Sequence, residues 1–158
     1  EQPPVRGMID VHSQFTVDAQ FLPGTDDVIA WVSAAAAERA NTGEVAVRFV
    51  DEEEGLALNA AYRGADKATN VLSFAGDLPA EVGLDLFGDI VICTPVVVKE
   101  AQEQGKTIEA HYAHLIVHGT LHLLGFDHED DPSAQVMEGL ERNVMADLGY
   151  SDPYASPP

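Results

Sequence analysis

The sequence has few cysteines, few basic side chains and no long apolar run. Cys93 is the one cysteine among 158 residues, so an internal disulfide is excluded and a reducing compartment is favoured. No apolar run approaches the roughly 18 residues that a membrane-spanning helix needs. The first residues, EQPPVRG, contain neither the basic nor the apolar part of an export signal. We therefore expect a cytoplasmic protein with no membrane partner.

The shortage of basic residues bears on possible partners. Lys and Arg number 8 against 27 Asp and Glu, which gives a formal net charge of −19. A surface of this kind repels polyanions at long range. Physiological salt screens that repulsion beyond a Debye length of about 8 Å, so a local cationic site can still bind phosphate. The charge argues against a nucleic-acid partner but does not exclude one.

The chain is long and apolar enough for one packed domain, since hydrophobic residues make up 46% of it. We expect this domain to span residues 1–150 and residues 151–158 to form a loose tail. Apolar alternation predicts strands near residues 9–17, 43–50, 70–74 and 87–93. Helical periodicity and capping residues predict helices near residues 26–41, 51–62, 94–105, 107–124 and 131–148. We expect Asp26 or Asp27 to be the N-cap of the first of these helices and Thr94 to be the N-cap of the third. This order predicts an α/β fold (α+β mixed), with a mixed four-stranded sheet covered by about five helices.

The motif HGTLHLLGFDH, from His118 to His128, has the spacing of a metal site. On a helix, His118 and His122 lie on one face with their Cβ atoms about 6 Å apart, so both imidazoles can reach one zinc ion. Gly125 can adopt the left-handed conformation that ends a helix, which would bring His128 back to the same ion. Three protein ligands leave the fourth zinc position to water or substrate, as in catalytic zinc sites.

Two other interpretations of the motif are a set of ordinary histidines and a purely architectural zinc. The second usually requires a fourth ligand, most often cysteine, and this chain has only Cys93. The three-histidine spacing with its intervening glycine favours a catalytic site over both. On the same helical sector, His111 and His114 are either groups that support the metal ligands, as orienting residues or as an acid and base, or polar residues of the helix edge. Asp127 either orients an imidazole or is a turn residue.

The spacing also matches the ligand pattern of metzincin peptidases, with one difference. Those peptidases place their glutamate base directly after the first histidine, and here that position is Gly119. Phosphodiester cleavage instead needs a cation near the metal to stabilise phosphate charge. Arg63, with Lys67 nearby, could supply it, because guanidinium fits phosphate oxygens. The spacing is equally compatible with Arg63 binding the carbonyls at the end of its own helix.

Four stretches together resemble the YbeY-type ribosomal RNA maturation endoribonucleases of bacteria. They are HGTLHLLGFDH, AYRGADKATNVLSF, GDIVIC and KEAQEQGKTIEAHYAHLIVHG, and the resemblance covers about residues 45–150. It implies a zincin-like fold, a zinc ion on His118, His122 and His128, and a functional role for Arg63. It also implies single-strand-specific RNA cleavage, maturation of the 3′ end of 16S ribosomal RNA and a part in ribosome quality control.

Our hypothesis is therefore a zinc-dependent endoribonuclease in which Arg63 clamps the scissile phosphate and small-subunit ribosomal RNA and proteins are the partners. Arg48, Asn70 and Ser73 are candidates for the RNA groove, although strand polarity explains Asn70 and Ser73 as well. One alternative is a ribosome-assembly protein with an architectural zinc, whose acidic surface docks basic ribosomal proteins. Another is a metzincin-like peptidase that lacks the usual glutamate base.

Overall fold

The described part of the chain forms a mixed four-stranded sheet. The computed structural model describes residues 8–17, 22–37, 39–40, 42–63, 70–76, 86–126 and 130–155. The strands lie in the order β1 (Met8–Phe15), β2 (Thr42–Val50), β4 (Leu86–Cys93) and β3 (Val71–Ala75). The first three run parallel, and β3 pairs with β4 in the antiparallel direction at the edge of the sheet. The predicted mixed sheet is confirmed.

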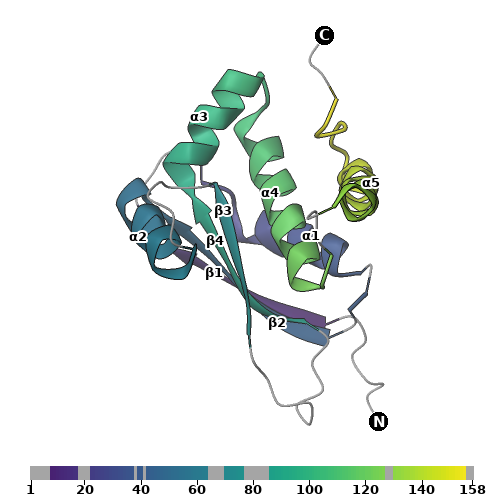
Figure 1. Cartoon of the computed structure of the whole chain (residues 1–158), viewed down its shortest axis with the longest axis horizontal. Coiled ribbons are helices and arrows are strands. Elements are labelled where there is room, and N and C mark those ends of the chain that lie inside the picture. The colour runs from purple at the N-terminus through teal and green to yellow at the C-terminus, as the bar shows by residue number, and fades with distance from the viewer. Residues whose placement is uncertain are drawn as a thin grey trace.

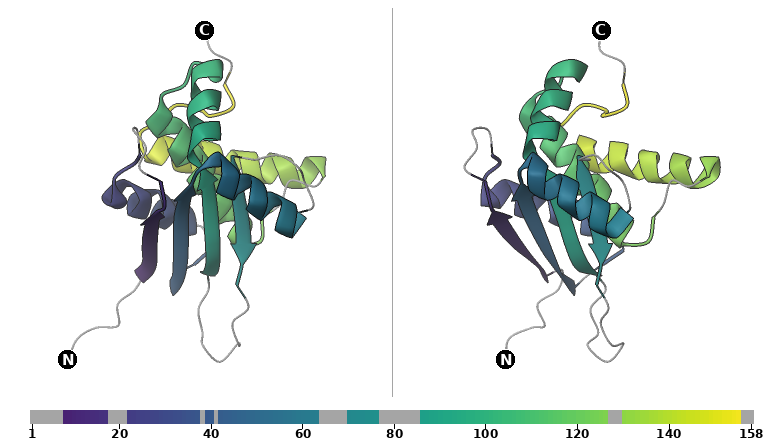
Figure 2. Two further views of the ribbon diagram at one scale, coloured as in Figure 1. Left: turned by 90° about the vertical axis from the view of Figure 1, so that its left-hand side faces the viewer. Right: turned by 60° about the vertical axis from the view of Figure 1, so that its left-hand side comes forward.

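Helices cover both faces of this sheet. The described residues form α1 (Thr25–Ala36), α2 (Glu52–Arg63), α3 (Thr94–Gln104), α4 (Ile108–Leu123) and α5 (Asp131–Asp147). Helix α2 lies on one face, while α1 and α4 cover the other face with α5 packed outside them (Figures 1 and 2). Helix α3 leads from the end of β4 into α4. Helix α4 therefore lies between the sheet and α5, where side chains can be held from two sides.

The helix ends follow local chemistry, with two differences from the sequence prediction. We expected Asp26 or Asp27 to cap α1, but the N-cap is Gly24 and both acids lie in the first turn, where the helix dipole favours them. We expected Thr94 to cap α3, but the N-cap is Cys93 and the Thr94 hydroxyl donates to the Val50 carbonyl at 3.3 Å. In both places the N-cap lies one to three residues before the polar side chain that we expected to cap the helix.

The core has two parts, one on each side of the sheet. The larger part lies between the sheet and helices α1, α4 and α5. The smaller part lies on the α2 side and contains Cys93, which is 2% exposed. Burial raises the pKa of the Cys93 thiol, so this residue is a packed apolar side chain, as the sequence predicts.

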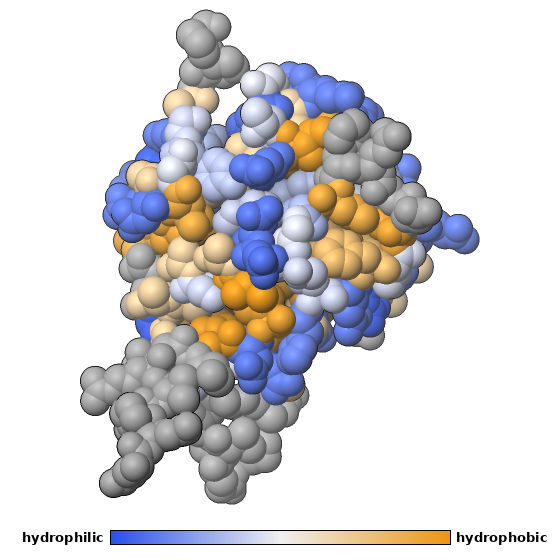
Figure 3. All heavy atoms as spheres, turned by 180° about the vertical axis from the view of Figure 1, so that it is seen from behind, coloured by the Kyte–Doolittle hydropathy of each residue, from blue (hydrophilic) through white to orange (hydrophobic). Residues whose placement is uncertain are grey.

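Apolar side chains at the surface are scattered over several elements. The larger exposed ones are Phe15, Ile29, Leu56, Val136 and Tyr154. On the face seen from behind, hydrophobic areas are separated by hydrophilic side chains (Figure 3). Within the described residues, no helix combines the length and the apolar character that crossing a bilayer would require.

Candidate metal centre

Helix α4 carries the first two histidines of the motif. Its start is fixed by the Thr107 side chain, which accepts a hydrogen bond from the backbone N–H of Ala110 at 3.1 Å. Most of the helix is buried, but His118 and His122 are only partly buried. One helical turn separates them, so both side chains lie at the same edge of α4. The predicted pairing of these two histidines on one helix face is confirmed.

The turn after α4 ends the helix and also orients His122. Gly125 has φ 101°, in the region that favours glycine, as the sequence predicts. The N–H groups of Gly125 and Phe126 donate to the carbonyls of His122 and Leu121 at 3.0 and 3.1 Å, which is a Schellman motif. This turn places the Phe126 carbonyl 3.1 Å from Nδ1 of His122. The ring of His122 is thereby held through Nδ1.

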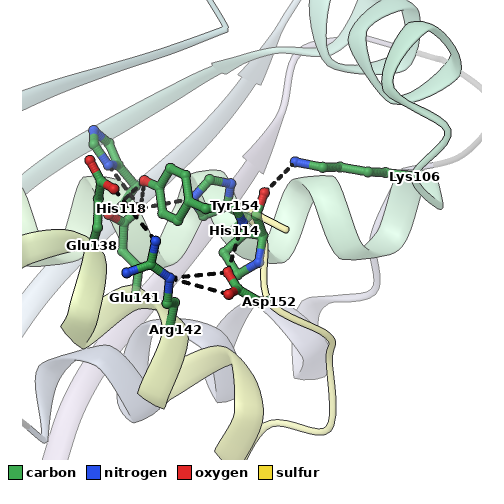
Figure 4. A network of polar contacts seen from close by, with 9 residues as sticks. Lys106, His114, His118, Glu138, Glu141, Arg142, Asp152 and Tyr154 are labelled. Atoms are coloured by element: carbon green, nitrogen blue, oxygen red, sulfur yellow. Dashed lines mark hydrogen bonds and ion pairs between the residues drawn. The ribbon is translucent and has the colours of Figure 1, made fainter. Parts of the chain in front are cut away.

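Glu141 of α5 holds the ring of His118 through Nδ1, as the Phe126 carbonyl holds the ring of His122. Its carboxylate is 0% exposed, and its Oε1 lies 3.1 Å from Nδ1 of His118 and 2.8 Å from Nε2 of His114 (Figure 4). Burial alone would raise the pKa of Glu141, but hydrogen bonds from His114 and His118 outweigh burial and lower this pKa to about 2. Glu141 is therefore an anion at neutral pH and accepts a hydrogen bond from Nδ1 of His118.

These contacts fit a metal-binding role. With Nδ1 engaged in each ring, Nε2 is the nitrogen through which His118 and His122 can bind a metal ion, and metal-binding histidines are commonly held in this way. The third predicted ligand, His128, lies outside the described residues, and so does Asp127. Within the described ranges, no group of three or more His, Cys, Asp or Glu side chains is arranged so that it could hold a metal ion. The contribution of His128 therefore stays a prediction.

Gly119 faces the sheet rather than the candidate metal site. A Cβ atom on Gly119 would lie 3.0 Å from the Ser73 hydroxyl and 3.2 Å from Cγ2 of Ile90. The helix thus packs closely on β3 and β4 at this position. A glutamate here would point into those strands, so the position that carries the base in metzincins has no room for one. This packing argues against the peptidase interpretation.

The other polar residues singled out in the sequence are engaged within the fold. His111 lies 2.9 Å from Glu100, whose Oε1 also accepts a hydrogen bond from Asn70 at 2.9 Å. Burial lowers the pKa of His111 despite the Glu100 contact, so this ring is neutral at neutral pH. The Ser73 hydroxyl lies 3.4 Å from the Gly119 carbonyl. These contacts connect β3, α3 and α4, which supports a structural role for Asn70 and Ser73.

The two candidate phosphate-binding arginines occupy different places. Arg63 is the last residue of α2, whose end extends past edge strand β3 (Figure 2); its side chain and Lys67 lie outside the described part of the chain. Arg48 lies on the α2 side of the sheet, where its guanidinium donates hydrogen bonds to Oε1 of Gln14 at 3.2 Å and to Oε2 of Glu54 at 3.4 Å. Since α4 lies on the other side, the structure does not bring Arg48 next to the histidines.

Sequence reasoning missed Glu141, although a signal was present. The buried residues of α5 are Met137, Glu141, Val144 and Met145, which form one helical stripe. An acid in such a stripe must be paired when it is buried. The stripe predicts a partner for Glu141 but does not say which residue it is.

The fold and the site together define a mixed α/β protein with a candidate histidine metal centre at the end of a buried helix. The family model described as Endoribonuclease YbeY matches residues 10–149. The chain belongs to this family.

Curated relatives support the same assignment. The chain is 54% identical over 156 residues to Endoribonuclease YbeY of Xanthomonas axonopodis pv. citri (strain 306), with 96% of each chain covered. It is 53% identical, with the same coverage, to Endoribonuclease YbeY of Stenotrophomonas maltophilia (strain R551-3). The fold is similar to the solution structure of TM1509 from Thermotoga maritima, with a TM-score of 0.59 and 24% identity over 94% of this chain and 99% of that one.

Proposed function

We propose that this endoribonuclease is a cytoplasmic enzyme that uses zinc to cleave single-stranded RNA. Its role would be the maturation of the 3′ end of 16S ribosomal RNA and ribosome quality control. The observation that carries the proposal is the pair of hydrogen bonds that hold Nδ1 of His118 and of His122, because they prepare both rings for one metal ion. The family assignment supports RNA as the substrate.

The proposed zinc ligands are His118, His122 and His128. Imidazole nitrogens suit zinc, and the family is consistent with a metal-dependent enzyme. Zinc bound there would supply Lewis-acid activation of the phosphodiester and of water. Glu141 and the Phe126 carbonyl keep the first two rings oriented before the ion arrives, so that little rearrangement is needed on binding.

Arg63 is the proposed phosphate clamp. Helix α2 ends near edge strand β3 on one face of the sheet, and α4 packs on the same strand from the other face through Gly119, so both helices approach one edge of the sheet (Figure 2). A guanidinium at this edge would bind two non-bridging phosphate oxygens and stabilise the charge that develops during cleavage. His114 is buried and bonded to Glu141, which supports an orienting role rather than proton transfer to RNA.

The proposed partners are small-subunit ribosomal RNA and proteins of the small ribosomal subunit. The net charge of −19 supports contacts with basic ribosomal proteins, because opposite charges steer such partners together. The same charge limits the affinity for RNA far from the site. We therefore expect RNA to be held mainly near the metal and Arg63, with the ribosomal proteins adding the remaining contacts.

A cleavage assay on an unstructured RNA oligonucleotide tests this proposal. Wild type, His122→Ala and Arg63→Ala would be compared with zinc present and with zinc chelated, and a double-stranded RNA would test strand specificity. We expect chelation and His122→Ala to abolish cleavage above background. Arg63→Ala should slow cleavage by about 100-fold or more, the usual cost of losing one group that stabilises transition-state charge.

Lys99→Ala is the charge control, since Lys99 is exposed on α3 and its nearest carboxylate, on Glu103, lies 4.0 Å away. It should cleave at the wild-type rate. An Arg63→Ala variant as fast as wild type would refute the clamp. If the wild-type protein with zinc cuts no faster than background, the proposed catalytic zinc is wrong and an architectural zinc gains support.

A further inference from the structure

Residues 151–155, which the sequence assigns to a loose tail, are docked against α4 and α5. Asp152 pairs with Arg142 of α5, with Nε–O distances of 3.3 and 3.2 Å. The Pro153 carbonyl accepts a hydrogen bond from Nζ of Lys106 at 2.9 Å, and Pro153 itself is buried. These contacts hold the two residues that directly precede Tyr154 (Figure 4).

Tyr154 reaches from this segment to the carboxylate that contacts His118. Its hydroxyl lies 2.9 Å from Oε1 and 2.8 Å from Oε2 of Glu141. Its ring packs edge-to-face against His114 with a centroid distance of 5.2 Å, and the Arg142 guanidinium lies 5.3 Å from the centroid of the Tyr154 ring. The ring is therefore fixed from two sides, and its hydroxyl bridges both oxygens of a carboxylate that is 0% exposed.

We propose that Tyr154 and Glu141 are positioning residues for the metal centre. The Tyr154 hydroxyl fixes the rotation of the Glu141 carboxylate, and the carboxylate holds His118 in the tautomer that carries its hydrogen on Nδ1. Nε2 of His118 then faces the metal as an acceptor. This inference rests on the proposed metal site, and it assigns to the C-terminal segment a part in building that site.

His114 and His118 compete for a single oxygen of Glu141. Oε1 of Glu141 accepts hydrogen bonds from both rings, at 2.8 Å from Nε2 of His114 and 3.1 Å from Nδ1 of His118. A carboxylate that can rotate would follow the shorter contact and lengthen the one to His118. Because Tyr154 contacts both oxygens, it opposes that rotation. Groups that orient metal-binding histidines typically change metal affinity by about 10–100-fold when they are removed.

Two variants separate the hydroxyl from the carboxylate. Tyr154→Phe removes only the hydroxyl and keeps the ring contacts with His114 and Arg142. Glu141→Gln keeps the side-chain shape and removes the charge. Tyr150→Phe is the matched control, because the Tyr150 hydroxyl donates to another carboxylate, that of Glu109, at 2.8 Å.

Two measurements would be made on each variant. The first is the zinc dissociation constant, obtained by competition with a chelator of known affinity. The second is the tautomer of His118 in the metal-free protein, read from ¹⁵N chemical shifts of the ring. We expect the Nδ1–H form in wild type and in Tyr150→Phe. Tyr154→Phe should bind zinc about 10-fold more weakly and show both tautomers, and Glu141→Gln should bind up to about 100-fold more weakly.

The result that overturns the proposal is a Tyr154→Phe variant with wild-type zinc affinity and an unchanged His118 tautomer. If Glu141→Gln does not fold, Tyr154→Phe alone decides. A wild-type protein that binds no zinc would contradict the proposed metal centre instead. In that case the tautomer of His118 in Tyr154→Phe still decides whether the segment orients the ring.

Discussion

Gly119 is the residue whose size controls how closely α4 approaches the sheet. It follows the first histidine of the motif directly, and the space where its Cβ would lie is bordered by Ser73 of β3 and Ile90 of β4. The same feature distinguishes the site from that of a peptidase, because the position that would carry a base is filled by the sheet. One missing side chain therefore affects both packing and chemistry.

Gly119→Ala should lower the free energy of unfolding by about 1 kcal/mol, because crowding a packed site costs more than the helix gains from alanine. Gly139→Ala is the control, since Gly139 is also helical but, among the described residues and apart from the backbone of its own helix, no heavy atom lies within 4 Å of its Cβ position. It should raise stability by about 0.5–1 kcal/mol. Urea denaturation measures both. A Gly119→Ala variant as stabilised as Gly139→Ala would show that the contact with the sheet is loose.

The turn at the end of α4 acts as one element with two roles. Gly125 ends the helix, and the Phe126 carbonyl that follows holds Nδ1 of His122. The guanidinium of Arg39 stacks on Phe126 at 4.0 Å from the ring centroid, which holds the turn against the segment that follows α1.

Gly125→Ala should weaken both the fold and the binding of zinc. Its φ of 101° is unfavourable for alanine, and Gly105, at the end of α3, has φ 66° and provides the control. Both substitutions should cost about 1–2 kcal/mol in unfolding free energy. Only Gly125→Ala should also raise the zinc dissociation constant, because only that turn contacts a histidine of the site. Equal zinc affinity in the two variants would exclude an orienting role for the turn.

The sequence predicts well those features that depend on residues close together in the chain. Residues within one or two helical turns determine the start of α4 near Thr107, the positive φ of Gly125 and the shared face of His118 and His122. The contact of Glu141 with His118 spans 23 positions and depends on how α5 crosses α4. Nothing in the spacing of SDPYASPP indicates that Tyr154 docks, because its partners come from two separate helices.

At the scale of the whole molecule, the layers bring the proposed parts of the site to one edge. The order of strands leaves antiparallel β3 at that edge, with α4 packed on one face and α2 ending on the other (Figures 1 and 2). The net charge of −19 gives the molecule as a whole a negative field, which attracts metal cations and opposes RNA. In the proposed site, a cation bound by the histidines, together with Arg63, would offset that field where phosphate binds.

Native mass spectrometry of the purified protein with zinc tests whether His118, His122 and His128 bind one and the same ion. Wild type, His118→Ala, His122→Ala and His128→Ala would be compared with His12→Ala, which changes an exposed histidine that contacts Glu44 on the sheet. We predict one zinc per chain in wild type and His12→Ala, and loss of that zinc in each of the other three. Full zinc retention by His128→Ala, or no zinc in wild type, would show that these three histidines do not bind zinc together.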